Sequence, residues 1–115
     1  MEKQRVIVEL GSGNDLHGGD YTKASVRALE DALRHSSLTM LRSLQKKPED
    51  MEIRIIVGVQ KPTLVNPIEI KNQIPYGSVE VEVVHGGLDI PDPELNDIVV
   101  IASVAIEVRL EISLD

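Results

Sequence analysis

The chain contains no cysteine, phenylalanine or tryptophan, and its only aromatic side chains belong to Tyr21 and Tyr76. Without cysteine, neither a disulfide nor a thiolate metal site can form, which agrees with a reducing compartment. The sequence also lacks a signal-peptide pattern and an apolar run long enough to span a membrane as a helix. These absences predict a cytoplasmic protein with no membrane partner and a core of aliphatic side chains.

The formal net charge of the 115 residues is -7. Negative charge repels nucleic acid phosphates, and two tyrosines cannot provide a base-stacking platform, so a nucleic acid partner is excluded from the interpretation. The length predicts a single domain over residues 1–115, whose core is modest because such a chain buries only about two thirds of its unfolded surface.

Hydrophobic periodicity predicts the secondary structure. Apolar residues recur every two positions in four segments, as in strands, and every three or four positions after residue 20, as in a helix. Pro91 and Pro93 indicate a loop before the last strand. The expected elements are a strand at 4–10, a glycine-rich loop at 11–20, a helix from there to about 45, a strand at 51–59, a short helix after Asn66, a strand at 78–85, a loop at 89–96 and a strand at 97–112.

The short helix has a clear start signal. Asn66 is its expected N-cap, Pro67 occupies the first helical position, and Glu69 is placed to complete a capping box. Val65 and Ile70 are spaced for a hydrophobic staple. The helix is expected to run for about two turns before Pro75.

This order, β-α-β-α-β-β, predicts an α+β fold: a four-stranded mixed sheet with two helices on one face. Two helices cannot cover both faces, yet the pattern leaves a second apolar face. Its expected members are Ile7, Ile56, Val84, Val99 and Ile101. Such a surface on a small domain favours self-association into a closed ring, the alternative being that loops cover it.

The glycine loop does not fit the known phosphate-binding motifs. After Gly11 and Gly13, the third glycine of G-x-G-x-x-G would fall at position 16, which is Leu16, and Asp15 would repel a phosphate. The lysine and hydroxyl pair of a P-loop is also absent.

Asp15 and His17 are two residues apart, so in an extended segment their side chains point the same way. A carboxylate beside an imidazole fixes its tautomer, and such a pair can act as a general base. Alternatively the two residues supply metal ligands together with His85 or Asp89. The third interpretation is that Asp15 only bonds the turn backbone and His17 packs.

Two lysines are candidates for holding an anionic group on a ligand. Lys23 lies in the first turn of the long helix, where the helix dipole also favours an anion, and Lys71 lies in the short helix. The triplet His85-Gly86-Gly87 repeats His17-Gly18-Gly19, which allows two loops, from one subunit or two, to meet at one site. His35, on the long helix, is interpreted as a surface residue.

The pattern Gly11-x-Gly13-x-Asp15-x-His17-Gly18 resembles the defining motif of a family of conserved hypothetical proteins, the Lin-type family, and the similarity extends over nearly the whole chain. No activity is assigned to that family. The topology is similar to the Bacillus-type chorismate mutase fold, which implies a trimer with ligand sites between subunits. Residues 13–22 are also similar to a repeat-domain stretch of cyanuric acid hydrolases, whose Ser-Gly-Gly and lysine catalytic elements have no clear counterpart here.

The function expected from the sequence is binding of a small polar or anionic metabolite at the interface of a homotrimer, without a cofactor. If the protein is an enzyme, hydrolase or isomerase chemistry is expected, with His17 as base and Asp15 as its orienter. Ligand contacts are expected from the glycines of the motif, the two lysines and His85. The alternative is a non-catalytic structural trimer whose glycine loop only shapes the interface.

Overall fold

The computed structural model describes residues 3–34 and 50–111. These residues form five strands, two α-helices and one short 3-10 helix. In chain order the elements are β1 (Lys3–Asp15), α1 (Tyr21–Arg34), β2 (Glu52–Val59), the 3-10 helix η2 (Pro62–Leu64), α3 (Pro67–Lys71), β3 (Ser78–His85), β4 (Leu88–Asp92) and β5 (Asp97–Glu111).

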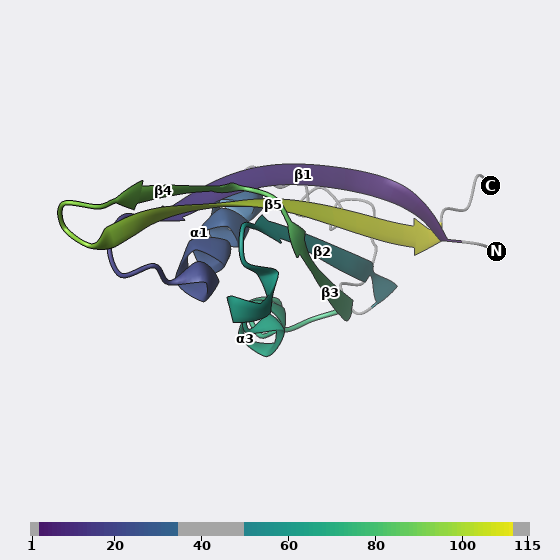
Figure 1. Cartoon of the computed structure of the whole chain (residues 1–115). Coiled ribbons are helices and arrows are strands. Elements are labelled where there is room, and N and C mark those ends of the chain that lie inside the picture. Colours follow the sequence, from purple (N-terminus) through teal and green to yellow (C-terminus); the bar gives the residue numbers. More distant parts are fainter. Residues whose placement is uncertain (1–2, 35–49, 112–115) are drawn as a thin grey trace.

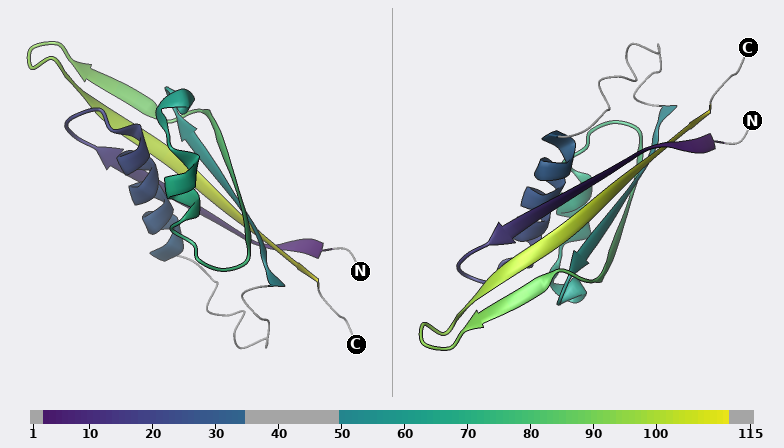
Figure 2. Two further views of the ribbon diagram at one scale, coloured as in Figure 1. Left: turned by 90° about the horizontal axis from the view of Figure 1, so that it is seen from below. Right: turned by 90° about the horizontal axis from the view of Figure 1, so that it is seen from above.

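The five strands form one mixed sheet in the order β1-β5-β2-β3, with β4 also paired to β5. Strand β5 is antiparallel to β1, β2 and β4, whereas β2 and β3 are parallel and are joined by a crossover through η2 and α3. Both α-helices lie on one face of the sheet (Figures 1 and 2). The α+β class, the mixed sheet and the placement of two helices on one face are therefore as the sequence predicted.

The core lies between the sheet and α1. The even-numbered residues of β5 from Val100 to Leu110 are all buried, as are the odd-numbered residues of β2 from Ile53 to Val59. Helix α1 contributes mainly small side chains to this layer, because it lies very close to the sheet. Its buried apolar residues are Tyr21, Ala24, Ala28, Leu29 and Ala32.

The predicted loop at 11–20 is wrong in its first half. Residues 11–15 continue β1, pairing with residues 100–104 of β5, and only residues 16–20 form a turn. Glycine usually weakens a strand, which is why this segment was interpreted as a loop. Here the missing side chains instead make room for α1.

The predicted loop at 89–96 is also partly wrong, because β4 spans Leu88–Asp92 and raises the strand count to five. Pro91 pairs with Ile98 within this strand. Proline is tolerated there because β4 is an edge strand, where one N–H needs no ladder partner.

Two further expectations concern the helices. Helix α1 is described as far as Arg34, and the rest of the predicted helix, including His35, lies outside the described residues. The N-cap of α3 is confirmed, since the Asn66 side chain accepts from the Ile68 N–H at 3.1 Å. The capping box is wrong: the Asn66 N–H donates to Thr22 Oγ1 at 2.9 Å, which joins α3 to α1.

The face of the sheet away from the helices, called here the open face, carries a group of mostly apolar side chains, with the paired Ser12 and Ser103 among them. Ile7 was assigned to it incorrectly: the pairing register of β1 shifts between Arg5 and Ile7, which turns Ile7 toward the helices. The strand pairings place the following residues together on the open face, and we call them the apolar band: Leu10, Ile56, Val84, Leu88, Ile90, Val99, Ile101 and Ala105.

The other end of the open face is charged but internally neutralised. Glu107 is buried, and its carboxylate lies 3.2 Å from both Arg5 and Arg54 and 3.9 Å from Arg109. The hydrogen bond from Arg5 is the largest of the effects that lower the pKa of Glu107, which burial alone would raise. Arg54 also pairs with Glu82.

No described helix is both long and apolar enough to cross a membrane.

Candidate functional site

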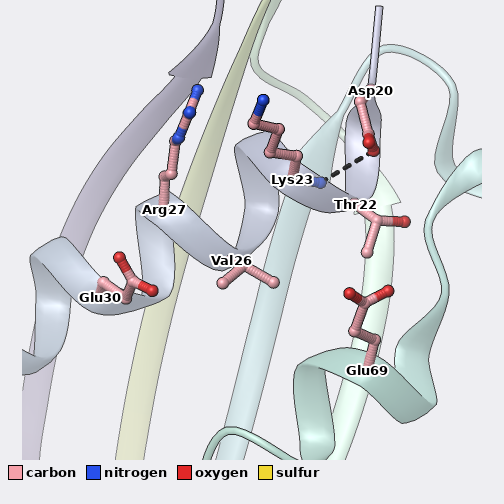
Figure 3. A pocket seen from close by; sticks show the side chains of 7 residues that line it. All are labelled: Asp20, Thr22, Lys23, Val26, Arg27, Glu30 and Glu69. Atoms are coloured by element: carbon pink, nitrogen blue, oxygen red, sulfur yellow. Dashed lines mark hydrogen bonds between the residues drawn. The ribbon is translucent and has the colours of Figure 1, made fainter.

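The turn between β1 and α1, called here the motif turn (residues 15–20), is held by three carboxylates. Asp15 Oδ2 accepts from the Asp20 N–H at 2.9 Å, and Asp97 Oδ1 accepts from the Gly18 N–H at 2.9 Å. Asp20 caps α1 by accepting from the Lys23 N–H at 3.0 Å (Figure 3). The turn is therefore fixed both to its own helix and to the start of β5.

Gly11 and Gly13 have a packing role in this arrangement. A Cβ atom on Gly11 would lie 2.4 Å from the carbonyl oxygen of Ala28, and one on Gly13 would lie 2.2 Å from its backbone nitrogen. Only glycine therefore lets α1 lie so close to β1. The backbone of these two predicted ligand contacts faces the helix, whereas Gly18 lies in the exposed turn with φ of 95°.

His17 has Asp97 as its partner. Its Nδ1 atom lies 3.1 Å from Asp97 Oδ2. The Gly18 N–H is the largest cause of the lowered pKa of Asp97, followed by the Ile98 N–H and the His17 hydrogen bond. An ionised carboxylate only accepts, so the proton of a neutral His17 ring lies on Nδ1 and leaves the lone pair of Nε2 directed outward. The side chain of His17 is 81% exposed.

Asp15, the partner that the sequence suggested for His17, has other contacts. It is only 3% exposed, and its Oδ1 atom lies 3.7 Å from both Lys23 Nζ and Arg27 Nη1. Arg27 also donates to the carbonyl oxygen of Asn14 at 2.7 Å. The buried carboxylate is thus compensated by two half-exposed cations, one of which is the predicted anion-binding Lys23.

Tyr21 and Asp89 form a second hydrogen-bonded pair, which lies on the other side of β5. The hydroxyl of Tyr21 donates to Asp89 Oδ2, and the pairings place Asp89 and Asp15 on either side of Val100. Burial, and next the hydrogen bond to Asp89, raise the pKa of Tyr21 to about 12. Asp89 Oδ1 is buried and has no hydrogen-bond partner among the described residues.

The remaining predicted residues lie apart from the motif turn. His85 ends β3, and Lys71 ends α3; both are exposed. In the described part of the chain, no three histidine or carboxylate side chains gather as a possible metal site. Asp15 and His17 are thus not joined by His85 or Asp89 within one copy, as the metal alternative required.

A groove of about 420 Å³ lies beside the N-terminal half of α1. Figure 3 shows Lys23 and Arg27 on one side of the helix, and Val26 and Thr22 on the side that faces Glu69 of α3. The groove mixes acidic and basic groups, which suits a small polar molecule better than a simple anion. Its lining residues are Asp20, Thr22, Lys23, Val26, Arg27, Glu30 and Glu69.

The fold and the motif turn define a small α+β protein with helices on one sheet face and an exposed histidine–aspartate pair at the sheet end. A family model described as "Conserved hypothetical protein (Lin0512_fam)" matches residues 5–108, and the chain belongs to this family. A crystal structure of a FtsZ-like protein of unknown function from Nostoc punctiforme is 32% identical, with a TM-score of 0.83, covering 97% of this chain and 99% of that one. No curated protein matches significantly.

Proposed function

We propose that the protein is a cytoplasmic homotrimer that binds a small polar or anionic metabolite at the motif turn, between copies, and transfers a proton there. The observation that carries this proposal is the His17–Asp97 pair. An imidazole held by a carboxylate through Nδ1, with Nε2 free, is the arrangement of an oriented general base.

The chemistry that this pair supports is proton abstraction from a water molecule or from a carbon or hydroxyl group of the ligand, as in hydrolases and isomerases. Asp97 replaces Asp15 as the orienting residue, because Asp97 lies within hydrogen-bond distance of the ring and Asp15 is engaged by the turn backbone and two cations. Lys23 and Arg27 lie half-exposed on the first turns of α1 and supply positive charge for an anionic group. Lys71 and His85 would reach this ligand only from another copy.

Self-association is supported by the apolar band. Leu10 is 68% exposed and Leu88 and Ile90 are also exposed. Contiguous apolar surfaces of this kind on small proteins mark contacts with other molecules. A closed ring buries such a surface in every copy, and three copies are the number that we expected from the sequence. Neither nucleic acid nor a membrane has a part in this proposal.

The second candidate function is a non-catalytic trimer, favoured by a separate observation. Gly11, Gly13 and Asp15 of the motif all have structural contacts: two lie beneath α1, and one holds the turn. In this case the motif preserves the shape of an interface, and no metabolite binds.

The two candidates are separated by screening the assembled protein against polar and anionic metabolites with native mass spectrometry, which reports stoichiometry and bound ligand together. His17→Asn and Asp97→Asn are compared with Lys61→Gln, a control at an exposed position outside the turn. Our proposal expects both turn variants to remain assembled but to bind the hit more weakly. Any turnover should fall by about 100-fold or more in His17→Asn.

Two results would contradict the proposal. The first is a protein that remains a monomer at micromolar concentration, because the site then has no second copy. The second is equal ligand binding by His17→Asn and the wild type. Loss of assembly in the His17 variant, with no metabolite found for the wild type, would favour the structural trimer.

A further inference from the structure

The groove beside α1 has walls that are fixed to each other. Its lining residues come from α1 and the residue that caps this helix, except Glu69, which belongs to α3. Thr22 joins the two helices, because its hydroxyl accepts from the Asn66 N–H at 2.9 Å and donates to the Leu64 carbonyl oxygen at 3.4 Å. The groove is therefore formed before any ligand arrives, and a ligand does not have to order its walls.

The positive side of the groove has unused hydrogen-bond donors. Lys23 and Arg27 are one turn apart on α1, and their side chains extend from the same side of the helix (Figure 3). Both lie 3.7 Å from the same Oδ1 atom of the buried Asp15, so two half-exposed cations share one carboxylate. Arg27 also donates to the Asn14 carbonyl oxygen at 2.7 Å. The remaining N–H groups of the ammonium and the guanidinium can hold a carboxylate of a ligand.

The negative side of the groove has two carboxylates without a partner. Glu30 on α1 and Glu69 on α3 form neither a hydrogen bond nor an ion pair through their carboxylates within residues 3–34 and 50–111. Figure 3 shows the Glu69 side chain pointing from α3 toward Thr22 and Val26. Asp20 differs from these two glutamates, because its carboxylate caps α1. A positively charged group in the groove would therefore find two uncompensated carboxylates, one from each wall.

The balance of charge in the groove favours a ligand that carries both signs. With Asp15 included, the carboxylates outnumber the two cations, so an anion alone would meet net negative charge. A cation alone would leave the donors of Lys23 and Arg27 unused. Val26 lies between the charged groups and is half-buried, so it offers an apolar contact to the middle of a ligand (Figure 3).

The two charges of such a ligand have to be separated along its length. Glu30 is three residues beyond Arg27 and seven beyond Lys23, which corresponds to about 4.5 Å and 10.5 Å along the helix axis at about 1.5 Å per residue. An ammonium and a carboxylate on one carbon atom cannot span this offset, whereas a short carbon chain between them can. The groove, of about 420 Å³, has room for a molecule of this size.

We propose that the groove beside α1 binds an amino carboxylate whose ammonium and carboxylate groups lie at opposite ends of a short apolar chain. Lys23 and Arg27 hold the carboxylate, Val26 contacts the chain, and Glu30 and Glu69 hold the ammonium group. The inference rests on the proposed function in one respect: it takes the anionic group assigned there to the two cations and specifies what the other end of the ligand carries. It requires neither a second copy nor the His17–Asp97 pair.

The first test compares three probes of the full chain at neutral pH. The probe 5-aminopentanoate carries both charged ends, whereas pentanoate and pentylamine carry one each. Methyl chemical shifts of Val26 report binding in the groove. Exposed ion pairs each contribute little, so millimolar dissociation constants are expected, with 5-aminopentanoate binding about five-fold more tightly than either single-charge probe. Equal affinities for the three probes, or no shift of Val26 with any of them, would overturn the inference.

The second test removes one charge from the groove. Glu69→Gln keeps the size of an exposed side chain and should weaken binding of 5-aminopentanoate about three-fold, while pentanoate binds no more weakly than to the wild type. Glu94→Gln is the matched control, because Glu94 is exposed in the turn between β4 and β5, outside the groove. If Glu69→Gln binds 5-aminopentanoate as the wild type does, or if both variants weaken binding equally, the assignment of the ammonium group is wrong.

Failure of this inference differs from failure of the proposed function. A metabolite whose binding depends on His17 but not on Glu69 would overturn the inference and leave the proposed function in place. A wild type that remains a monomer and binds 5-aminopentanoate in the groove would overturn the proposed assembly and support the inference, because all residues of the groove belong to one chain.

Discussion

Gly13 of β1 lies directly beneath Ala28 of α1, so close that a Cβ atom at position 13 would come within 2.2 Å of the Ala28 nitrogen. The atoms in the way belong to the helix backbone and cannot turn aside as a flexible side chain would. The short distance therefore makes glycine a requirement of this helix–sheet contact, independently of any ligand.

Gly13→Ala is expected to destabilise the fold by about 3 kcal/mol, at the upper end of typical overpacking costs. Gly11→Ala should behave similarly, since its Cβ atom would meet the same helix. Urea denaturation followed by circular dichroism measures the change. Gly58→Ala is the control, because its nearest atom would be the Cα of Gly86 at 3.4 Å. Unchanged stability of Gly13→Ala would show that α1 does not approach β1 so closely.

Tyr21→Phe removes the hydroxyl that donates to Asp89, whose other carboxylate oxygen already lacks a partner among the described residues. Loss of a hydrogen bond to a charged group should cost about 1.5–3 kcal/mol of unfolding free energy at neutral pH. Denaturant unfolding of the variant and the wild type measures this difference. A variant as stable as the wild type would mean that Asp89 obtains an equivalent donor elsewhere.

Tyr21 should also make the fold sensitive to alkali. Its pKa is raised from 10.0 to about 12 in the folded state, so the protonated phenol stabilises the fold fully below pH 10. This contribution, about 2–3 kcal/mol, is lost as the pH rises from 10 through 12. Tyr76→Phe leaves Tyr21 as the only tyrosine, and the ultraviolet absorbance of tyrosinate then reports its ionisation directly. Ionisation of Tyr21 near pH 10 in a folded chain would contradict the expectation.

Asp97→Asn should release the ring of His17. The Asp97 carboxylate fixes the Nδ1–H tautomer of the ring. An amide at this position can accept or donate a hydrogen bond, so it fixes neither the Nδ1–H nor the Nε2–H tautomer. Nitrogen chemical shifts of the His17 ring should move toward the Nε2–H tautomer that free histidine prefers, while those of His85 stay unchanged. Identical shifts of His17 in both proteins would exclude Asp97 as its partner.

Asp97 also contributes to acid stability. Its pKa is lowered, chiefly by the Gly18 N–H, so its stabilising contribution is present above the ordinary carboxyl pKa and is lost as the pH falls through the folded value. Asp97→Asn should therefore reduce stability at neutral pH and make it less dependent on pH in the acid range. A parallel loss at all pH values would contradict this origin.

Glu107→Gln should weaken the charged end of the open face. The change leaves Arg5, Arg54 and Arg109 close together without their shared carboxylate. The lowered pKa of Glu107 means that the wild type loses this stabilisation as the pH falls. Thermal unfolding should show a larger loss for Glu107→Gln than for Glu80→Gln, which removes an exposed carboxylate from the same face. Equal losses would show that the arginine contacts contribute little.

The parts of the fold that depend on alternating patterns could be predicted from the sequence. Strands β2 and β3 start and end within one residue of the predicted bounds, and the even-numbered residues of β5, all apolar, are buried from Val100 to Leu110. In both cases periodicity alone decides the face, because these strands are regular. The bulge in β1 has no such signal, so the side chain of Ile7 was assigned to the opposite face.

The candidate site was predicted only in part. The sequence suggested Asp15 as the partner of His17, but the ring contacts Asp97, which is 80 residues away from His17, and no local pattern links these two. Tyr21 and Asp89 were missed as a pair for the same reason. Chain-distant contacts of this kind follow from the pairing register of β4, β5 and β1, which a sequence pattern does not specify.

Lys3 and Glu111 are direct neighbours across the β1–β5 pairing, so the two described ends of the chain lie side by side. Circular permutation is therefore open to this fold: a short linker could join the old ends, and new ends could be placed in the exposed turn at 93–96. Such a chain would keep the strand pairings while dividing the hairpin between β4 and β5, so its stability would show how much the unbroken hairpin contributes to folding.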